Sequence, residues 1–162
     1  MIARARSIVG VLVTVGALAG CNGASPCGTL AGAVSGTISN CSNSSAIYNQ
    51  ARDTTSVSLS AEGPLPVSGA IQVSFSVAGR PAAGTFHDGD AALGSAQVQF
   101  ATSDGHQYDA DWAGGQQAGV GHLTIVIDSV TQATGQYVVH GTCDATTLED
   151  SAGPACTAHV NF

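Results

Sequence analysis

The chain has 162 residues, and its four arginines and no lysine stand against 11 acidic residues, which gives a formal net charge of −7 at pH 7. Binding to nucleic acid requires several Lys or Arg side chains per site, so this composition excludes nucleic acid as a partner. It also excludes electrostatic adhesion to anionic lipid. Because lysine is absent, amine nucleophiles, Schiff bases and the P-loop lysine are excluded as well.

Residues 1–20 have the layout of a secretory signal. Arg4 and Arg6 precede an apolar run from Ile8 to Ala19, and we expect this leader to be removed. The run that ends it, Leu18-Ala19-Gly20-Cys21, resembles the lipobox of bacterial lipoproteins. That resemblance implies that the Cys21 thiol takes a diacylglycerol and that Cys21 becomes the first mature residue.

The leader allows two other interpretations. An ordinary signal could be cut after Ala19, because Ala17-Leu18-Ala19 is a small-x-small site. An uncut membrane anchor would need about 20 apolar residues, more than this run supplies. The cysteine count favours lipidation, since the chain has five cysteines and modification of Cys21 leaves an even set for an oxidising compartment.

Without its leader the chain has 142 residues, the size of one domain. We expect residues 21–27 to form a lipid-anchored tether and residues 28–162 to form a single monomeric domain. Arg52 and Arg80 are then the only basic residues against 11 acids, a net charge of −9. The membrane contact is therefore expected to come from acyl chains on Cys21. Asn22, which follows the lipid cysteine, favours the outer membrane over inner-membrane retention.

Apolar and polar residues alternate through most of the mature chain, which is typical of half-buried β-strands. Gly, Pro, Asn and Asp separate the alternating runs and predict turns. The pattern predicts an all-β fold of about 8–10 strands, an antiparallel sandwich of immunoglobulin-like or jelly-roll-like type, with a small barrel as the alternative. The expected strands are centred on residues 57–59, 71–77, 96–100, 108–112, 123–127, 137–139 and 156–162, with weaker ones at 30–38, 46–50 and 84–86.

The last two strands can be aligned as a hairpin with Tyr137 opposite Phe162. In that register Cys143 faces Cys156 on the buried side, within the distance that a disulfide tolerates. Cys27 and Cys41 can meet only if the chain turns back at Gly32 or Gly36, and we expect these two cysteines to form the second disulfide. Crossed pairing with Cys143 and Cys156 remains the alternative, and zinc binding is disfavoured because no C-x-x-C spacing occurs.

The same register predicts a group of histidines on the outer face. His140 would lie opposite His159, and His122 on the preceding strand would lie diagonally near His140. Three imidazoles could share Zn²⁺, Cu²⁺ or Ni²⁺. The alternative, which we prefer, is that these are three solvated histidines on a polar face.

Other candidate chemistry is weaker. The acidic turns at residues 87–90 and 104–105 could supply oxygen ligands for Ca²⁺, but Asp-Gly is also a common turn signal and no EF-hand spacing occurs. The chain has no G-x-S-x-G elbow and no S-x-x-K motif of hydrolases. Tyr108 and Trp112 could contact carbohydrate, although alternating aromatic residues on a strand are more often part of the core.

The β-rich, lysine-free body resembles small envelope lipoproteins of high-GC bacteria, most closely at Tyr137-Val138-Val139-His140-Gly141-Thr142. This resemblance implies a location, and no catalytic role is carried over from it. We therefore expect a lipid-anchored envelope protein with a structural or ligand- or partner-binding role, without catalysis and without a cofactor. The alternative is a metal-handling or hydrolytic envelope protein.

Overall fold

The structure is a computed structural model that describes residues 25–42, 45–113, 121–133, 136–150 and 153–162. The described residues contain no helix, and their strands form one antiparallel sheet, which confirms the all-β fold class. The eleven strands are β1 (Pro26–Gly32), β2 (Gly36–Ser39), β3 (Ser45–Asn49), β4 (Thr54–Glu62), β5 (Val67–Ala78), β6 (Gly84–His87), β7 (Leu93–Thr102), β8 (Gln107–Ala113), β9 (Leu123–Ala133), β10 (Gln136–Asp150) and β11 (Gly153–Asn161).

Each run of alternating residues became a strand because its apolar side chains face the core and its serines and glutamines face outward. In β5, for example, Ile71, Val73 and Phe75 are buried while Gln72 and Ser74 are exposed. The number of strands exceeds the expected 8–10 because the run at residues 30–38 is two strands, β1 and β2, joined by a turn.

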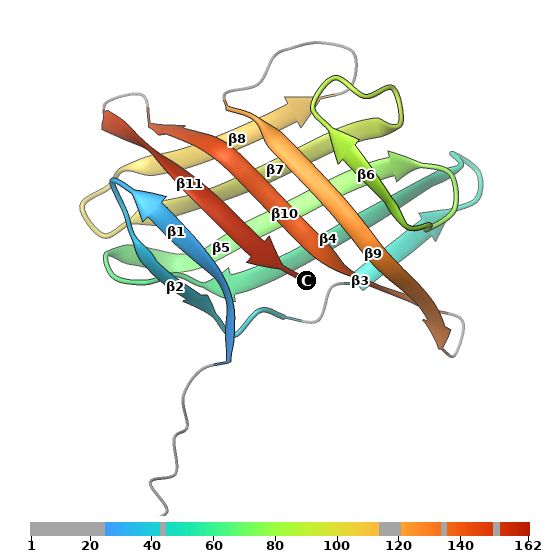
Figure 1. The fold of residues 1–162 in the computed structure, drawn as a ribbon, viewed down its shortest axis with the longest axis horizontal. Coiled ribbons are helices and arrows are strands. Elements are labelled where there is room, and N and C mark those ends of the chain that lie inside the picture. Colours follow the sequence, from blue (N-terminus) through green and yellow to red (C-terminus); the bar gives the residue numbers. More distant parts are fainter. Residues whose placement is uncertain (1–24, 43–44, 114–120, 134–135, 151–152) are drawn as a thin grey trace, which may run out of the picture.

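The strand pairings form a closed circuit. From β10 the neighbours run through β11, β1, β2, β4, β5, β7 and β8 and return to β10, while β9 and β6 extend the sheet from β10. Figure 1 shows the result as two layers whose strands cross, with β11, β10, β9 and β6 in front of β4, β5, β7 and β8. The corner pairings β2–β4 and β8–β10 each consist of one residue pair. The described strands thus form crossing layers that are joined at these two corners.

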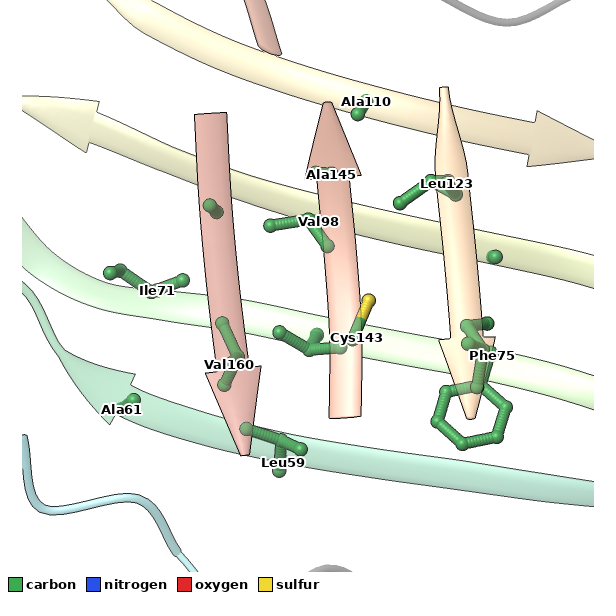
Figure 2. Packing of buried hydrophobic residues seen from close by; sticks show 14 of the residues in the cluster. Leu59, Ala61, Ile71, Phe75, Val98, Ala110, Leu123, Cys143, Ala145 and Val160 are labelled. Carbon is green, nitrogen blue, oxygen red and sulfur yellow. The ribbon is translucent and has the colours of Figure 1, made fainter. Parts of the chain in front are cut away.

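One hydrophobic cluster fills the space between the layers. Figure 2 shows Val160 and Cys143 from the front layer packed near Ile71 and Val98 from the back layer. Ile71, Val98 and Val160 are completely buried. Full burial of one such side chain contributes about 1.5–3 kcal/mol, so the alternating pattern is also the main source of stability.

The predicted disulfide between Cys27 and Cys41 is confirmed, with a Cα–Cα distance of 6.1 Å. The chain reverses between β1 and β2, as the sequence required, and both expected turn residues have positive φ angles, +109° at Gly32 and +143° at Gly36. This reversal brings the two cysteines to the same end of the β1–β2 hairpin.

The predicted pairing of Cys143 with Cys156 is wrong. Cys143 lies opposite Val160 and Cys156 lies opposite Leu148, and both thiols are free and buried. Burial raises the pKa of the Cys143 thiol to about 12. The Cys156 sulfur instead accepts a hydrogen bond from the backbone N–H of Val34, at 3.2 Å.

The β10–β11 register differs from the expected one by four residues. Gly141, not Tyr137, lies opposite Phe162, and their backbones exchange hydrogen bonds of 2.8 and 2.9 Å. Alternation has a period of two, so any shift by an even number keeps the same side chains inside. A Cys143–Cys156 pairing would have made residues 144–155 a loop, but β10 continues to Asp150 and β11 already begins at Gly153.

A β-bulge changes the direction of side chains along β9. The register with β10 shifts between the pairs His140–Ser129 and Gly141–Ile127, so Asp128 is the extra residue. Val130 then packs against the core, on the same side as Ile127. Next to the bulge, a Cβ added to Gly141 would collide with the carbonyl oxygen of Val126, so this position requires glycine.

Candidate ligand-binding groove

A groove of about 510 Å³ opens where two parts of the sheet separate. β3 pairs with β10 only at Ala46–Tyr137 and Ser45–Val138, whereas it continues along β4 as far as Asn49–Thr54. Figure 1 shows the end of β3 and the end of β9 diverging at the right of the molecule. We call the resulting hollow the Tyr48 groove; it is lined by Ala46, Ile47, Tyr48, Gln50, Arg80, Gln132, Gln136 and Tyr137.

Three of the lining side chains sit at positions that face the core elsewhere along their strands. Tyr48 follows buried Ala46 by two residues on β3 and pairs with Thr55, which is completely buried. Tyr137 packs against the core, and Gln132 is its partner across β9 and β10. Because the layers diverge here, these side chains border solvent. The groove is therefore the open end of the space between the layers.

Arg80 is held at the edge of the groove by its preceding residue. The Gly79 N–H donates to the Asp53 carbonyl oxygen at 2.7 Å, and the Gly79 carbonyl accepts from the Thr55 hydroxyl at 2.8 Å. Gly79 has a φ of +84°, which favours glycine at this turn. These contacts bring the Arg80 guanidinium over the ring of Tyr48, with Cζ 5.7 Å from the ring centroid, within the range of a cation–π contact.

The hydroxyl of Tyr48 donates a hydrogen bond of 2.7 Å to Asp53 Oδ1. This bond raises the pKa of the Tyr48 phenol, since a carboxylate acceptor stabilises the protonated form. The turn that carries Asp53 is closed by Asn49, whose Oδ1 accepts from the N–H groups of Ala51 and Arg52 at 3.1 and 3.2 Å. The orientation of the ring is thus set by both ends of the β3–β4 turn.

The groove joins three kinds of chemistry. Tyr48 and Tyr137 offer aromatic surface with a polar tip, Arg80 offers a positive charge with several N–H donors, and the three glutamines offer amide donors and acceptors. Ligand sites in proteins are commonly hollows of about 300–1,000 Å³ that combine aromatic walls with a few polar groups. In size and lining the Tyr48 groove fits that description.

A second hollow, of about 280 Å³, lies on the outer face of β5, β7 and β8. The hollow lies where the pairing of β5 with β7 shifts in register between Ser68 and Gln72, and Asp109 forms part of its wall. Burial raises the pKa of Asp109, although a hydrogen bond of 3.3 Å from Gln97 Nε2 opposes this shift. The ring of Tyr108 is buried there, so this hollow offers less aromatic surface than the Tyr48 groove.

The predicted cluster of three histidines is wrong. His140 and His159 both lie on the outer face, but His140 is opposite Ser129 and His159 is opposite Asp144. His122 lies next to Asp88, with Nδ1 2.9 Å from Oδ2. Its position before the start of β9 places it far along that strand from Ser129 and therefore from His140.

Each outer-face histidine instead has its own surroundings. His159 Nδ1 lies 2.6 Å from Asp144 Oδ1, and His122 forms an ion pair with Asp88 when protonated. Across the part of the chain that the structure describes, no group of three or more His, Cys, Asp or Glu side chains could hold a metal ion. The four-residue shift between β10 and β11 separates His140 from His159, and the β9–β10 register separates His122 from His140.

Two further sets of candidate residues serve the fold. Tyr108 is buried and stacks on Phe100 with ring centroids 4.9 Å apart. Trp112 is partly buried against the core, and its indole N–H donates to the Leu93 carbonyl oxygen at 3.3 Å. The Asp-Gly pairs mark turns as expected, since Gly89 and Gly105 have φ angles of +96° and +95°.

The expected lipidation site, Cys21, and the leader before it lie outside the described residues. Where the chain is described, it contains no helix that is long and apolar enough to cross a membrane.

Sequence reasoning missed the Tyr48 groove because its residues come from three distant segments. The one available signal was the placement of two tyrosines at core-facing positions of strands where aliphatic residues are usual.

Comparison with models of known protein families, with curated proteins and with solved structures finds no match in any of the three.

Proposed function

We propose that this protein is a lipid-anchored binding protein of the bacterial envelope and that the Tyr48 groove is its ligand site. The observation that carries the binding role is the lining of the groove, which combines two tyrosines, an arginine and three glutamines in one hollow of about 510 Å³. The role is binding without catalysis, and the protein acts as a monomer.

The anchor rests on the sequence of the leader. Lipid chains on Cys21 would hold an acidic domain at a membrane that its net charge cannot attract, and two or more chains hold stably where one is marginal. Residues 22–25 would leave the domain close to that membrane, because an extended chain spans only about 3.5 Å per residue. We place the anchor in the outer membrane.

Membrane fractionation and labelling with radioactive palmitate test the anchor. Wild-type protein should carry the label and sediment with membranes, while Cys21→Ser should be unlabelled and soluble. Cys143→Ala is the matched control, because it also removes one cysteine but should keep both the label and the membrane location. Wild-type protein that is fully soluble and unlabelled would contradict the anchor.

A fragment screen by NMR tests the groove. Small sugars, amino acids and aromatic acids are added to the Cys21→Ser protein, and binders should shift the side-chain amide signals of Gln132 and Gln136. Gln132→Trp should fill the groove and abolish the shift of the Gln136 amide that remains, while Gln99→Trp, an exposed strand position at the smaller hollow, should preserve the shifts of both groove amides. Shifts that gather around Gln99, or no shifts with any fragment, would contradict this function.

A further inference from the structure

The Tyr48 groove contains a basic side chain that the fold does not use in an ion pair. From this feature and from the glutamines beside it, we infer that the ligand is a short saccharide that carries a carboxylate. This inference rests on the proposed function, because it names the ligand class of the same groove.

The carboxylate of the ligand is inferred from the Arg80 side chain. Among the described residues Arg80 forms no ion pair, and the nearby Asp53 carboxylate accepts the hydrogen bond of Tyr48 instead. Guanidinium has five N–H donors, and their geometry suits two parallel hydrogen bonds to one carboxylate. Arg80 is the only basic side chain that lines this groove, and the chain as a whole has a net charge of −7. An anionic ligand would therefore be attracted to Arg80 and repelled by the rest of the protein surface.

The saccharide part of the ligand is inferred from the glutamine and tyrosine side chains of the groove. Within the described parts of the chain, the side-chain amides of Gln50, Gln132 and Gln136 have no hydrogen-bond partner in the protein, so their donors and acceptors remain for a ligand. A sugar hydroxyl is itself both donor and acceptor, which matches an amide in either orientation. The rings of Tyr48 and Tyr137 provide the apolar surface on which the C–H face of a sugar packs.

Both aromatic side chains of the groove continue inward-facing rows of their strands. Tyr137 packs against the core cluster, while Tyr48 follows buried Ala46 by two residues on β3 and donates its hydroxyl to Asp53. A ligand seated at the open end of the interlayer space would touch both rings and would reach Arg80 on the rim. One sugar unit against the rings and one carboxylate against the guanidinium would satisfy all three kinds of lining group.

The test uses three probes on the Cys21→Ser protein: digalacturonate, its neutral counterpart galactobiose, and trialanine, which has a carboxylate but no sugar. Affinities are measured by calorimetry and the site by NMR shifts of the groove amides. Digalacturonate should bind about 10-fold more tightly than galactobiose, the factor expected for charged hydrogen bonds to one carboxylate. Trialanine should bind more weakly than either sugar.

Two arginine variants separate the groove from general charge. Arg80→Gln should remove the preference for digalacturonate over galactobiose. Arg52→Gln, which removes the same charge from the adjacent turn but does not line the groove, should keep it. High salt should reduce the preference in wild type, since exposed charges are screened.

Each possible failure has a different meaning. Equal binding of the two sugars at the groove, unchanged in Arg80→Gln, would overturn the carboxylate but leave the binding function intact. Tighter binding of trialanine would overturn the saccharide class. No groove shifts with any of the three probes would overturn the whole inference, while the fragment screen judges the proposed function separately.

Discussion

The guanidinium of Arg80 lies over the ring of Tyr48, with Cζ 5.7 Å from the ring centroid, although Tyr48 belongs to β3 and Arg80 follows the end of β5. Tyr48 also donates its hydroxyl to Asp53, so one side chain links the basic and acidic groups at this end of the molecule. The affinity and chemistry of the Tyr48 groove depend on this arrangement.

Removal of the Asp53 carboxylate should lower the pKa of Tyr48. The hydrogen bond to Asp53 is the main reason that this pKa lies above its ordinary value, and Arg80 acts in the opposite direction. Asp53→Asn removes the carboxylate that raises this pKa, whereas Arg80, which lowers it, remains. The phenol of Tyr48 should therefore ionise at lower pH. NMR titration of the Tyr48 ring carbons in wild type and in Asp53→Asn measures this; an unchanged titration of Tyr48 would contradict the contact.

The pair of Asp88 and His122 predicts a modest dependence of stability on pH. Partial burial acts to raise the pKa of Asp88, but the hydrogen bond and charge of His122 outweigh it and the pKa lies below its usual value. A carboxyl whose pKa is lower in the folded state stabilises the fold above its unfolded pKa, about 3.9, and this contribution is lost as pH falls through the folded pKa.

Urea unfolding of wild type and Asp88→Asn measures this contribution. Wild type should be more stable near neutral pH by up to about 1 kcal/mol, because the pair is exposed. The difference should vanish in strong acid. A difference that grows on acidification would have the wrong sign and would contradict the pair.

The disulfide between Cys27 and Cys41 should be the only one within the folded domain. Peptide mapping without reduction should recover a fragment that joins these two cysteines, and Cys27→Ala together with Cys41→Ala should cost about 2–4 kcal/mol of unfolding free energy. A fragment that joins either of them to Cys143 or Cys156 would restore the crossed pairing.

The thiols of Cys143 and Cys156 should be unreactive in the folded protein. Both are buried, and a pKa of about 12 leaves almost no thiolate at Cys143 at neutral pH. In the Cys21→Ser protein, Ellman's reagent should detect no thiol under native conditions and two per chain in denaturant. Immediate reaction of either thiol with the folded protein would show that the core is more open than the structure indicates.

Substitution of Gly141 should be severely destabilising. A Cβ at this position would collide with the Val126 carbonyl oxygen, and backbone atoms of a neighbouring strand cannot move aside as a flexible side chain can. Gly141→Ala should therefore cost more than about 3 kcal/mol, at the large end of single substitutions. Thr142→Ala, next to it on the outer face, should cost less than about 0.5 kcal/mol. Thermal or urea unfolding of both variants checks the contrast.

The strands themselves could be predicted from the sequence because alternation is a local property. Ile71, Val73 and Phe75 show which face of β5 is buried without any knowledge of its neighbours. The disulfide of Cys27 and Cys41 was also within reach, since the glycines between them allow the chain to reverse. Composition alone limited the partners, because a lysine-free chain with a net charge of −7 cannot neutralise a phosphate backbone.

The tertiary structure decided the register and the groove. An even shift of β11 along β10 leaves the pattern of buried residues unchanged, so packing along the whole strand selected the pairing of Cys143 with Val160 over its pairing with Cys156. The Tyr48 groove likewise depends on where β3 separates from β10 and on the bulge at Asp128, which brings Gln132 to the side of Tyr137. Such features arise from contacts between segments far apart in the chain, and no local pattern encodes them.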